Sequence, residues 1–153
     1  LLSDKDSDVR RAASNTLIEI IKQKLSLAEE GLSTIKPLLS DKDSDVRRAA
    51  SNTLIEIIKQ KPSLAEEGLQ AIKPLLSDKD SDVRRAASFA LIEIIKQKPS
   101  IAEEGLQAIK PLLNDGNWNV RDAASNALIE IIKQKPSLAE EGLQTIKPFL
   151  SDK

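Results

Sequence analysis

Apolar residues recur along the chain with the spacing of a helix that buries one face. Between residues 63 and 77 they fall on one arc when successive residues are placed about 100° apart, and they are Leu64, Ala65, Leu69, Ile72, Leu75 and Leu76. Gly68 lies inside this arc, where the missing side chain allows another helix to come close. The spacing predicts an amphipathic helix over residues 63–77.

Polar residues mark the ends of this first helix. Ser63 is followed three residues later by Glu66, which is the pattern of a capping box, and Glu67 adds negative charge at the positive end of the helix dipole. Pro74 lies late in the helix, on the side opposite the apolar arc. Its ring removes the donor for the carbonyl of Gln70, so we expect a bend there and not a break.

A second helix is predicted after a short acidic turn at residues 78–80. Asp80 or Ser81 is the expected N-cap residue, because short polar side chains accept hydrogen bonds from the first free N–H groups of a helix. Pro99 ends the helix. The apolar band between these ends has a helical period and consists of Val83, Ala86, Ala87, Ala90, Leu91, Ile94 and Ile95. The two helices together form an αα-hairpin.

This hairpin belongs to a 37-residue unit that occurs four times. The copies are residues 1–37, 38–74, 75–111 and 112–148, and residues 149–153 form a short stub. A fixed period of this length is typical of a solenoid, in which each unit buries its apolar face only against its neighbours. We therefore expect residues 1–153 to form a single repeat domain.

The two ends of the sequence lack the polar capping units that finish most solenoids, and there is no initiating methionine. We therefore expect a segment of a longer array. Because an open end exposes the surface on which the next repeat would stack, we also predict end-to-end self-association.

Composition narrows the chemistry available to the chain. Cysteine and histidine are absent, and aromatic residues make up only 2% of the chain, so the core must be aliphatic. The chain thus lacks thiol nucleophiles, imidazole bases and the usual ligands of transition metals. We expect no catalysis, no metal and no cofactor. The absence of cysteine fits a reducing compartment, so we expect a cytoplasmic location, and no stretch is apolar enough to cross a membrane.

Positive and negative charges balance within the repeats. Residues 38–74 carry six basic and six acidic side chains, and the whole chain has a net charge of −1. Proteins that bind phosphate backbones usually present a basic stripe, because neutralising phosphates supplies most of their affinity. The balance therefore disfavours nucleic acid as the partner.

The string LLSDKDSDVRRAAS followed by LIEII resembles the HEAT repeat and its HEAT-like, armadillo-type relatives. The resemblance covers all four units, and it implies an all-α, right-handed α-solenoid of four HEAT-like helical hairpins. It also implies that the second helices line the concave side of the array and that the array serves as a scaffold for partner proteins.

In this family, an aspartate of the turn and the arginine after the valine form a ladder between neighbouring repeats. We expect the matching residues here to have the same structural role. They are Asp4, Asp41, Asp78 and Asp115 with Arg10, Arg47, Arg84 and Arg121, each pair six residues apart.

Differences between the copies point to candidate binding residues. Phe89 stands where repeat 2 has Asn52, nearly opposite the centre of the apolar band, on the ridge formed by Arg85, Phe89, Glu93 and Lys96. We expect this ridge to face solvent, with Arg85, Arg48 or Asp122 near the ring. Phe89 either contacts a partner or is a harmless substitution, since single exposed apolar residues are common.

Trp118, the only tryptophan, lies in the most altered segment, where NDGNWNVRD replaces the SDKDSDVRR of repeat 2. It is either an exposed anchor of the kind enriched at binding sites or a packing residue that covers the end of the neighbouring hairpin. Gly116 and Asn117 tolerate a positive φ better than the residues they replace, so we expect a changed turn shape.

Taken together, the residues predict a protein-binding scaffold that presents a concave surface of second helices to a protein or peptide. Three alternatives stay open: a nucleic-acid-binding array, a structural or sensor segment of a larger multidomain protein, and a designed array, because near-identical repeats are typical of consensus designs. The candidate partner-binding residues are Phe89, Trp118, Arg85, Asp122, Asn126, Arg48 and Asn52.

Overall fold

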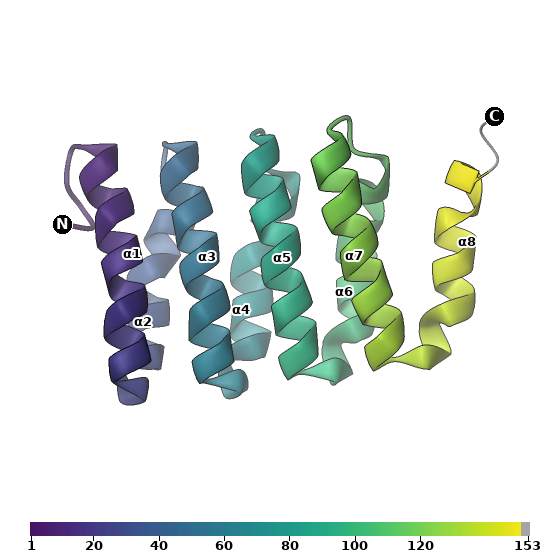
Figure 1. Cartoon of the computed structure of the whole chain (residues 1–153), viewed down its shortest axis with the longest axis horizontal. Helices are drawn as coiled ribbons and strands as arrows, with labels where there is room; N and C mark the ends of the chain where they lie inside the picture. Colours follow the sequence, from purple (N-terminus) through teal and green to yellow (C-terminus); the bar gives the residue numbers. More distant parts are fainter. Residues whose placement is uncertain (151–153) are drawn as a thin grey trace.

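The chain folds into two parallel rows of helices, one of long helices and one of short helices. The computed structural model describes residues 1–150. The long helices are α1 (Ser7–Gln23), α3 (Ser44–Gln60), α5 (Ser81–Gln97) and α7 (Trp118–Gln134). The short helices are α2 (Ala28–Ile35), α4 (Ala65–Ile72), α6 (Ala102–Ile109) and α8 (Ala139–Leu150). Figure 1 shows the long helices side by side in front, with α2, α4 and α6 behind them.

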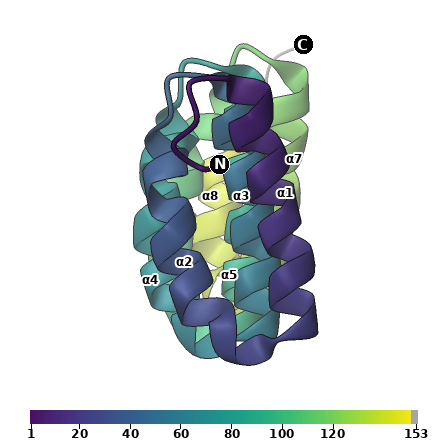
Figure 2. The same ribbon diagram turned by 90° about the vertical axis from the view of Figure 1, so that its left-hand side faces the viewer.

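The array winds in a right-handed sense. Seen from its N-terminal end, the chain descends along α1, rises along α2 and passes to α3 farther away, so it turns clockwise while it recedes (Figure 2). Residues 1–150 contain helices and turns and no strand. The predicted all-α, right-handed solenoid of repeated hairpins is confirmed.

Each long helix begins at a turn residue whose side chain caps it. In α5 the carboxylate of Asp80 accepts hydrogen bonds from the backbone N–H groups of Asp82 and Val83, at 2.9 and 3.3 Å. This satisfies two of the N–H groups that have no partner within the helix. The helix ends at Gln97, shortly before Pro99. Asp80 is thus the N-cap residue of the two that the sequence suggested.

The short helices begin differently from the prediction, because a 3-10 turn precedes each of them. These turns are η1 (Leu25–Leu27), η3 (Pro62–Leu64), η5 (Pro99–Ile101) and η7 (Pro136–Leu138). In repeat 2 the N-cap position of α4 is Leu64, without a side-chain cap, and the N–H of Leu64 already donates to the carbonyl of Lys61 at 3.0 Å. The predicted capping box of Ser63 with Glu66 is therefore wrong, since helical turns begin ahead of Ser63.

The prolines near the ends of the first three short helices change the helix type. The 3-10 segments η2 (Lys36–Ser40), η4 (Lys73–Ser77) and η6 (Lys110–Asn114) each carry proline near their start. Because Pro74 cannot donate a backbone hydrogen bond, α4 ends at Ile72 and tightens into η4. The expected simple bend is wrong here, although in repeat 4 α8 continues through Pro148.

The turn of repeat 4 has the same backbone shape as the other turns. Asn117 has φ and ψ of −93° and 124°, against −90° and 127° for Asp80. Within the described residues no φ is positive. The expected change of turn shape at Gly116 and Asn117 is therefore wrong: the substitutions alter the side chains and leave the path of the chain unchanged.

The core is a continuous aliphatic layer between the two rows. Its largest fully buried side chains are isoleucines and leucines, and each apolar arc that the sequence predicts contributes to it. At Gly68 the rows approach so closely that a Cβ atom would lie 2.8 Å from Cδ1 of Ile58. Glycine at this position therefore allows the short and long helices to pack tightly.

Candidate protein-binding surface

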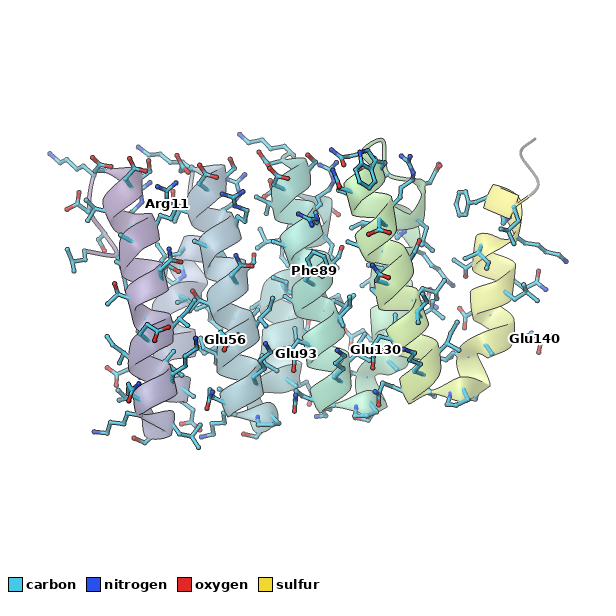
Figure 3. All side chains as sticks on the ribbon, viewed as in Figure 1. Arg11, Glu56, Phe89, Glu93, Glu130 and Glu140 are labelled. Atoms are coloured by element: carbon cyan, nitrogen blue, oxygen red, sulfur yellow. The ribbon has the colours of Figure 1, made fainter. Side chains whose placement is uncertain are left out.

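The long helices pack directly against one another, whereas the short helices are spaced more widely (Figure 1). The array therefore curves toward the exposed side of the long helices, which we call the concave face. Figure 3 shows Arg11, Glu56, Phe89, Glu93 and Glu130 on this face. Its bands of equivalent residues are Arg11, Arg48, Arg85 and Asp122; Asn15, Asn52, Phe89 and Asn126; and Glu19, Glu56, Glu93 and Glu130.

Arginine and aspartate side chains alternate across the first part of this face. Arg11 lies 2.9 Å from Asp8 of its own helix and 3.7 Å from Asp45 of α3. Arg48 repeats the arrangement, at 2.8 Å from Asp45 and 4.0 Å from Asp82 of α5. These side chains are well exposed, so each pair contributes little to stability. Arg11 and Arg48 therefore each have two carboxylate neighbours.

The alternation stops at Arg85. Its guanidinium carbon lies over the ring of Phe89, 5.3 Å from the ring centroid, which is the geometry of a cation–π contact. Across from it, α7 carries Asn119 where the earlier helices carry Asp45 and Asp82. Within residues 1–150, Arg85 has no ion pair or hydrogen bond through its side chain. Of the neighbours suggested for Phe89, the ring contact is with Arg85.

A small hollow lies between α3 and α5 at this point. It has a volume of about 120 Å³ and is lined by Arg48, Asn52, Asp82, Arg85, Ala86 and Phe89. Phe89 is 37% exposed, so part of its ring is available to a partner. Four of the predicted site residues, from two different repeats, thus come together in one place.

The remaining predicted site residues lie on α7, outside this hollow. Trp118 is the first residue of α7 and is 66% exposed, so it does not cover the neighbouring hairpin. Asp122 and Asn126 follow it at four-residue steps along the same ridge. The amide of Asn126 donates to the carboxylate of Asp122 at 3.4 Å. The ridge of α7 therefore continues the concave face with one aromatic and two polar side chains.

Three of the arginines that follow a valine, Arg10, Arg47 and Arg84, make contacts between repeats. Arg47 donates from Nε and Nη2 to the two carboxylate oxygens of Asp78, at 2.7 and 2.8 Å. Its Nη1 donates to the backbone carbonyl of Asp41, six residues earlier, at 2.7 Å. Arg10 with Asp41 and Arg84 with Asp115 repeat the bidentate contact. Arg121 donates to the carbonyl of Asp115 at 2.6 Å.

These contacts favour the charged form of the aspartates. Hydrogen bonds from Arg10 hold the pKa of Asp41 below its ordinary value, and those from Arg84 do the same for the pKa of Asp115. At Asp78 burial raises the pKa, but hydrogen bonds from Arg47 and the backbone outweigh it, so the pKa is again lowered. The arrangement ties successive turns together and leaves these charges inaccessible to a ligand.

Two sets of lysine–glutamate pairs join repeats at the short helices, and the sequence alone did not reveal them. In one set Lys36 and Lys73 bind Glu67 and Glu104 of the following repeat. In the other, Lys98 binds Glu66 of the preceding repeat at 2.6 Å. Glu66, Glu67 and Glu104, at the starts of the short helices, therefore also form ion pairs with lysines of neighbouring repeats. A spacing of 31 or 32 residues between lysine and glutamate is the signal that could have revealed these pairs.

Other hollows are larger but lie elsewhere. One of about 460 Å³ separates α7 from α8 and is almost wholly apolar, with Ile129, Ile132 and Phe149 in its lining. Another, of about 290 Å³, lies beside α1 and is lined in part by Leu2, Leu17 and Ile20. A third, of about 380 Å³, lies between η2 and the segments α4 and η4 of the next repeat. None of them is lined by Phe89, Trp118 or Asp122.

Residues 1–150 contain no group of three or more acidic side chains placed to hold a metal ion. No helix in the same range is long and apolar enough to span a membrane.

Three solved structures with a similar fold are of engineered or designed proteins. A computationally designed armadillo repeat protein, described as made for modular peptide recognition, superposes with a TM-score of 0.74 at 25% identity, over 99% of this chain and 72% of its own. Two engineered proteins from the Northeast Structural Genomics Consortium give TM-scores of 0.73 and 0.69 at 22% and 25% identity. Both alignments cover 99% of this chain, with 70% and 71% of the engineered chains.

Sequence comparisons give a family. No characterised protein matched the chain in a search by sequence. A family model described as sister chromatid cohesion protein PDS5 matches residues 1–151, which is nearly the whole chain. Together with the structural neighbours, this match confirms the HEAT-like, armadillo-type repeat architecture. The chain belongs to the PDS5 family of sister chromatid cohesion proteins.

Proposed function

We propose that the chain is a protein-binding scaffold whose concave face receives an extended segment of a partner protein. The observation that carries this proposal is the hollow at Phe89, where a partly exposed aromatic ring lies beside a guanidinium that has no carboxylate partner within residues 1–150. Aromatic residues and arginine are the types that dominate binding energy at protein interfaces.

The repetition of the face supports an extended segment as ligand. Asn15, Asn52 and Asn126 place a carboxamide at the same position of three repeats, and a carboxamide can both donate to and accept from a peptide backbone. Packed helices are about 10 Å apart, which is the length of roughly three extended residues. One repeat therefore matches about three residues of a bound strand.

The comparisons support the same kind of role. The designed armadillo protein that shares this fold is described as recognising peptides, and the family name refers to cohesion of sister chromatids. A partner that is a protein or peptide fits both descriptions.

The distribution of charge favours a protein over a nucleic acid. Arg11 and Arg48 are each already close to two carboxylates, and Asp82 and Asp122 line the same face. A phosphate backbone would meet these carboxylates and gain few free cations. The absence of cysteine supports a reducing location, and we propose the cytoplasm.

Selection from a random peptide library displayed on phage, with the immobilised chain as bait, tests the proposal. Selected peptides are then titrated against three variants. Phe89→Asn and Asp122→Arg install the residues of repeat 2, and Gln107→Ala changes the outer face as a matched control. We expect Phe89→Asn to weaken binding about tenfold, as for an interface hot spot, and Asp122→Arg to alter the affinity only if the ligand extends onto α7. Helix content should stay unchanged in all variants, and the control should bind normally.

Three results would contradict the proposal. Failure to select any peptide would favour a spacer or sensor role. Equal affinity for the wild type and the Phe89→Asn variant would remove the hollow as the site. Tight, salt-dependent retention on duplex DNA would favour the nucleic-acid alternative.

A further inference from the structure

We propose that the partner segment presents a carboxylate side chain to Arg85, next to an apolar side chain that packs on Phe89. This inference rests on the proposed function and names the chemistry of the ligand. It assigns to Arg85 a subsite for a single acidic residue of the bound strand, beside the hollow that Phe89 lines between α3 and α5.

The molecule itself supplies the template for this contact. Arg11 of α1 lies 3.7 Å from the carboxylate of Asp45 of α3, and Arg48 of α3 lies 4.0 Å from that of Asp82 of α5, so both form long ion pairs. At the third junction the residue in the same place is Asn119, which carries no charge. Arg85 is thus the one arginine of this band that the next repeat leaves without a carboxylate within residues 1–150.

The contact with Phe89 explains why Arg85 also forms no ion pair with the aspartate three residues earlier in its own helix. Arg11 and Arg48 each bind an aspartate three residues earlier, at 2.9 and 2.8 Å. The equivalent aspartate for Arg85 is Asp82, but the guanidinium lies over the ring of Phe89 instead. A guanidinium over a ring keeps its N–H donors in its own plane, where they can bind both oxygens of a carboxylate.

The surroundings select one carboxylate and not a chain of phosphates. Asp82 lines the hollow and Asp122 lies on the next helix, so a polyanion would be repelled on both sides. A single acidic side chain can occupy the place that Asp45 and Asp82 take in the earlier repeats. Ala86 and Phe89 form the apolar floor beside it, which suits an aliphatic or aromatic neighbour in the ligand.

The decisive variant is Asn119→Asp. It restores the aspartate that three repeats already carry at this position, as Asp8, Asp45 and Asp82, so it is compatible with the fold. We expect the new carboxylate to form an ion pair with Arg85 and so to compete with the carboxylate of the ligand. Asn114→Asp makes the same change in an exposed turn position of the same repeat, outside the concave face, and serves as the charge-matched control.

The probe is the set of peptides selected from the random library. We expect them to share an aspartate or glutamate next to an apolar residue. Replacing that acid by its amide should weaken binding about tenfold, the loss typical of one charge-assisted hydrogen-bonded pair. Asn119→Asp and Arg85→Gln should each weaken the acidic peptide similarly and leave its amide version unaffected, while Asn114→Asp should change neither. Unfolding midpoints of all variants verify that they are folded.

The outcomes separate the two proposals. Selected peptides that bind through Phe89 but contain no shared acid, or that bind the Asn119→Asp variant as well as the wild type, would overturn the acidic subsite and leave the scaffold proposal standing. If no peptide is selected, or if selected peptides ignore the Phe89→Asn substitution, the scaffold proposal fails and the subsite fails with it. If the chain binds duplex DNA and Arg85→Gln abolishes that binding, the group that Arg85 recognises is a phosphate and the carboxylate proposal is overturned.

Discussion

The guanidinium of Arg47 in α3 binds the carboxylate of Asp78, 31 residues later, through two hydrogen bonds of 2.7 and 2.8 Å. The same guanidinium binds the carbonyls of Asp41 and Lys42 in its own turn. One side chain therefore holds two successive turns in register. Because its side chain and that of Asp78 are 7% and 9% exposed, the pair is shielded from solvent and depends on both members.

Removing one member of this pair should destabilise the array strongly. We expect Asp78→Asn to lower the free energy of unfolding by about 3 kcal/mol, because it leaves the buried guanidinium of Arg47 without its counter-charge. Asp82→Asn, which removes an exposed carboxylate four residues further on, should cost about 0.5 kcal/mol or less. Urea unfolding followed by circular dichroism measures both changes, and equal costs would show that the buried pair has no special role.

Stability should also depend on pH in the acid range. The pKa values of Asp41, Asp78 and Asp115 are lowered in the folded chain from the ordinary value of 3.8. The unfolded chain then binds more protons at low pH, so the stability that these groups contribute is complete above pH 3.8 and is lost as the pH falls through their folded pKa values. Unfolding midpoints between pH 7 and pH 2 check this. A flat profile would contradict the contacts described.

The exposure of Trp118 should be visible in the fluorescence of the protein. As the only tryptophan, with 66% of its surface accessible, it should emit at the wavelength of indole in water and be quenched readily by acrylamide. A blue-shifted, protected emission would mean that the ring is packed against a neighbour. If a selected peptide reaches the ridge of α7, its binding should shift the emission to the blue.

Apolar side chains are exposed on the first and last repeats, so we expect residues 1–153 to self-associate when they are studied in isolation. Leu143 in α8 is 50% exposed, whereas its equivalent Leu106 is completely buried by the next repeat. At the other end, Ile20 is 46% exposed and its equivalent Ile57 is buried. The internal junctions show that these two kinds of surface fit each other, so α1 of one copy should pack on α7 and α8 of another.

Polar groups at the two ends are complementary as well. Lys24 and Glu140 stand in the places that Lys61 and Glu29 occupy at an internal junction, and these two form an ion pair. We expect the mean molar mass in size-exclusion chromatography with light scattering to rise with concentration. The variant Leu143→Lys should suppress this rise. A wild-type chain that stays monomeric at millimolar concentration would contradict the prediction.

Local features of the structure could be predicted from the sequence because they depend on neighbouring residues. Asp80 caps α5 through N–H groups two and three residues away, and the apolar arcs lie where their helical spacing places them. The prediction was wrong at Ser63 and Pro74, where short 3-10 segments take over from the α-helix. The energy difference between the two helix types is small, and tertiary packing decides between them.

The candidate site was harder to predict because its character depends on residues in different repeats. The sequence indicated that Phe89 lies on an exposed ridge. Within residues 1–150, however, the lack of a carboxylate partner for Arg85 depends jointly on Phe89 in its own helix and on Asn119 in the next one. Another contact that depends on residues of two repeats is the hydrogen bond between Ser14 and Thr53, whose hydroxyl oxygens lie 2.9 Å apart across the junction of α1 and α3.

Nuclear magnetic resonance tests the proposed binding face most directly, because side-chain amides on the two faces give separate signals. Asn52 and Asn126 lie on the concave face, whereas Gln70 and Gln107 lie on the outer face and bind Glu104 and Glu141. When a library-selected peptide is added, we expect the amide signals of Asn52 and Asn126 to shift and those of Gln70 and Gln107 to stay in place. Shifts confined to the two glutamines would place the ligand on the outer face and contradict the proposed scaffold.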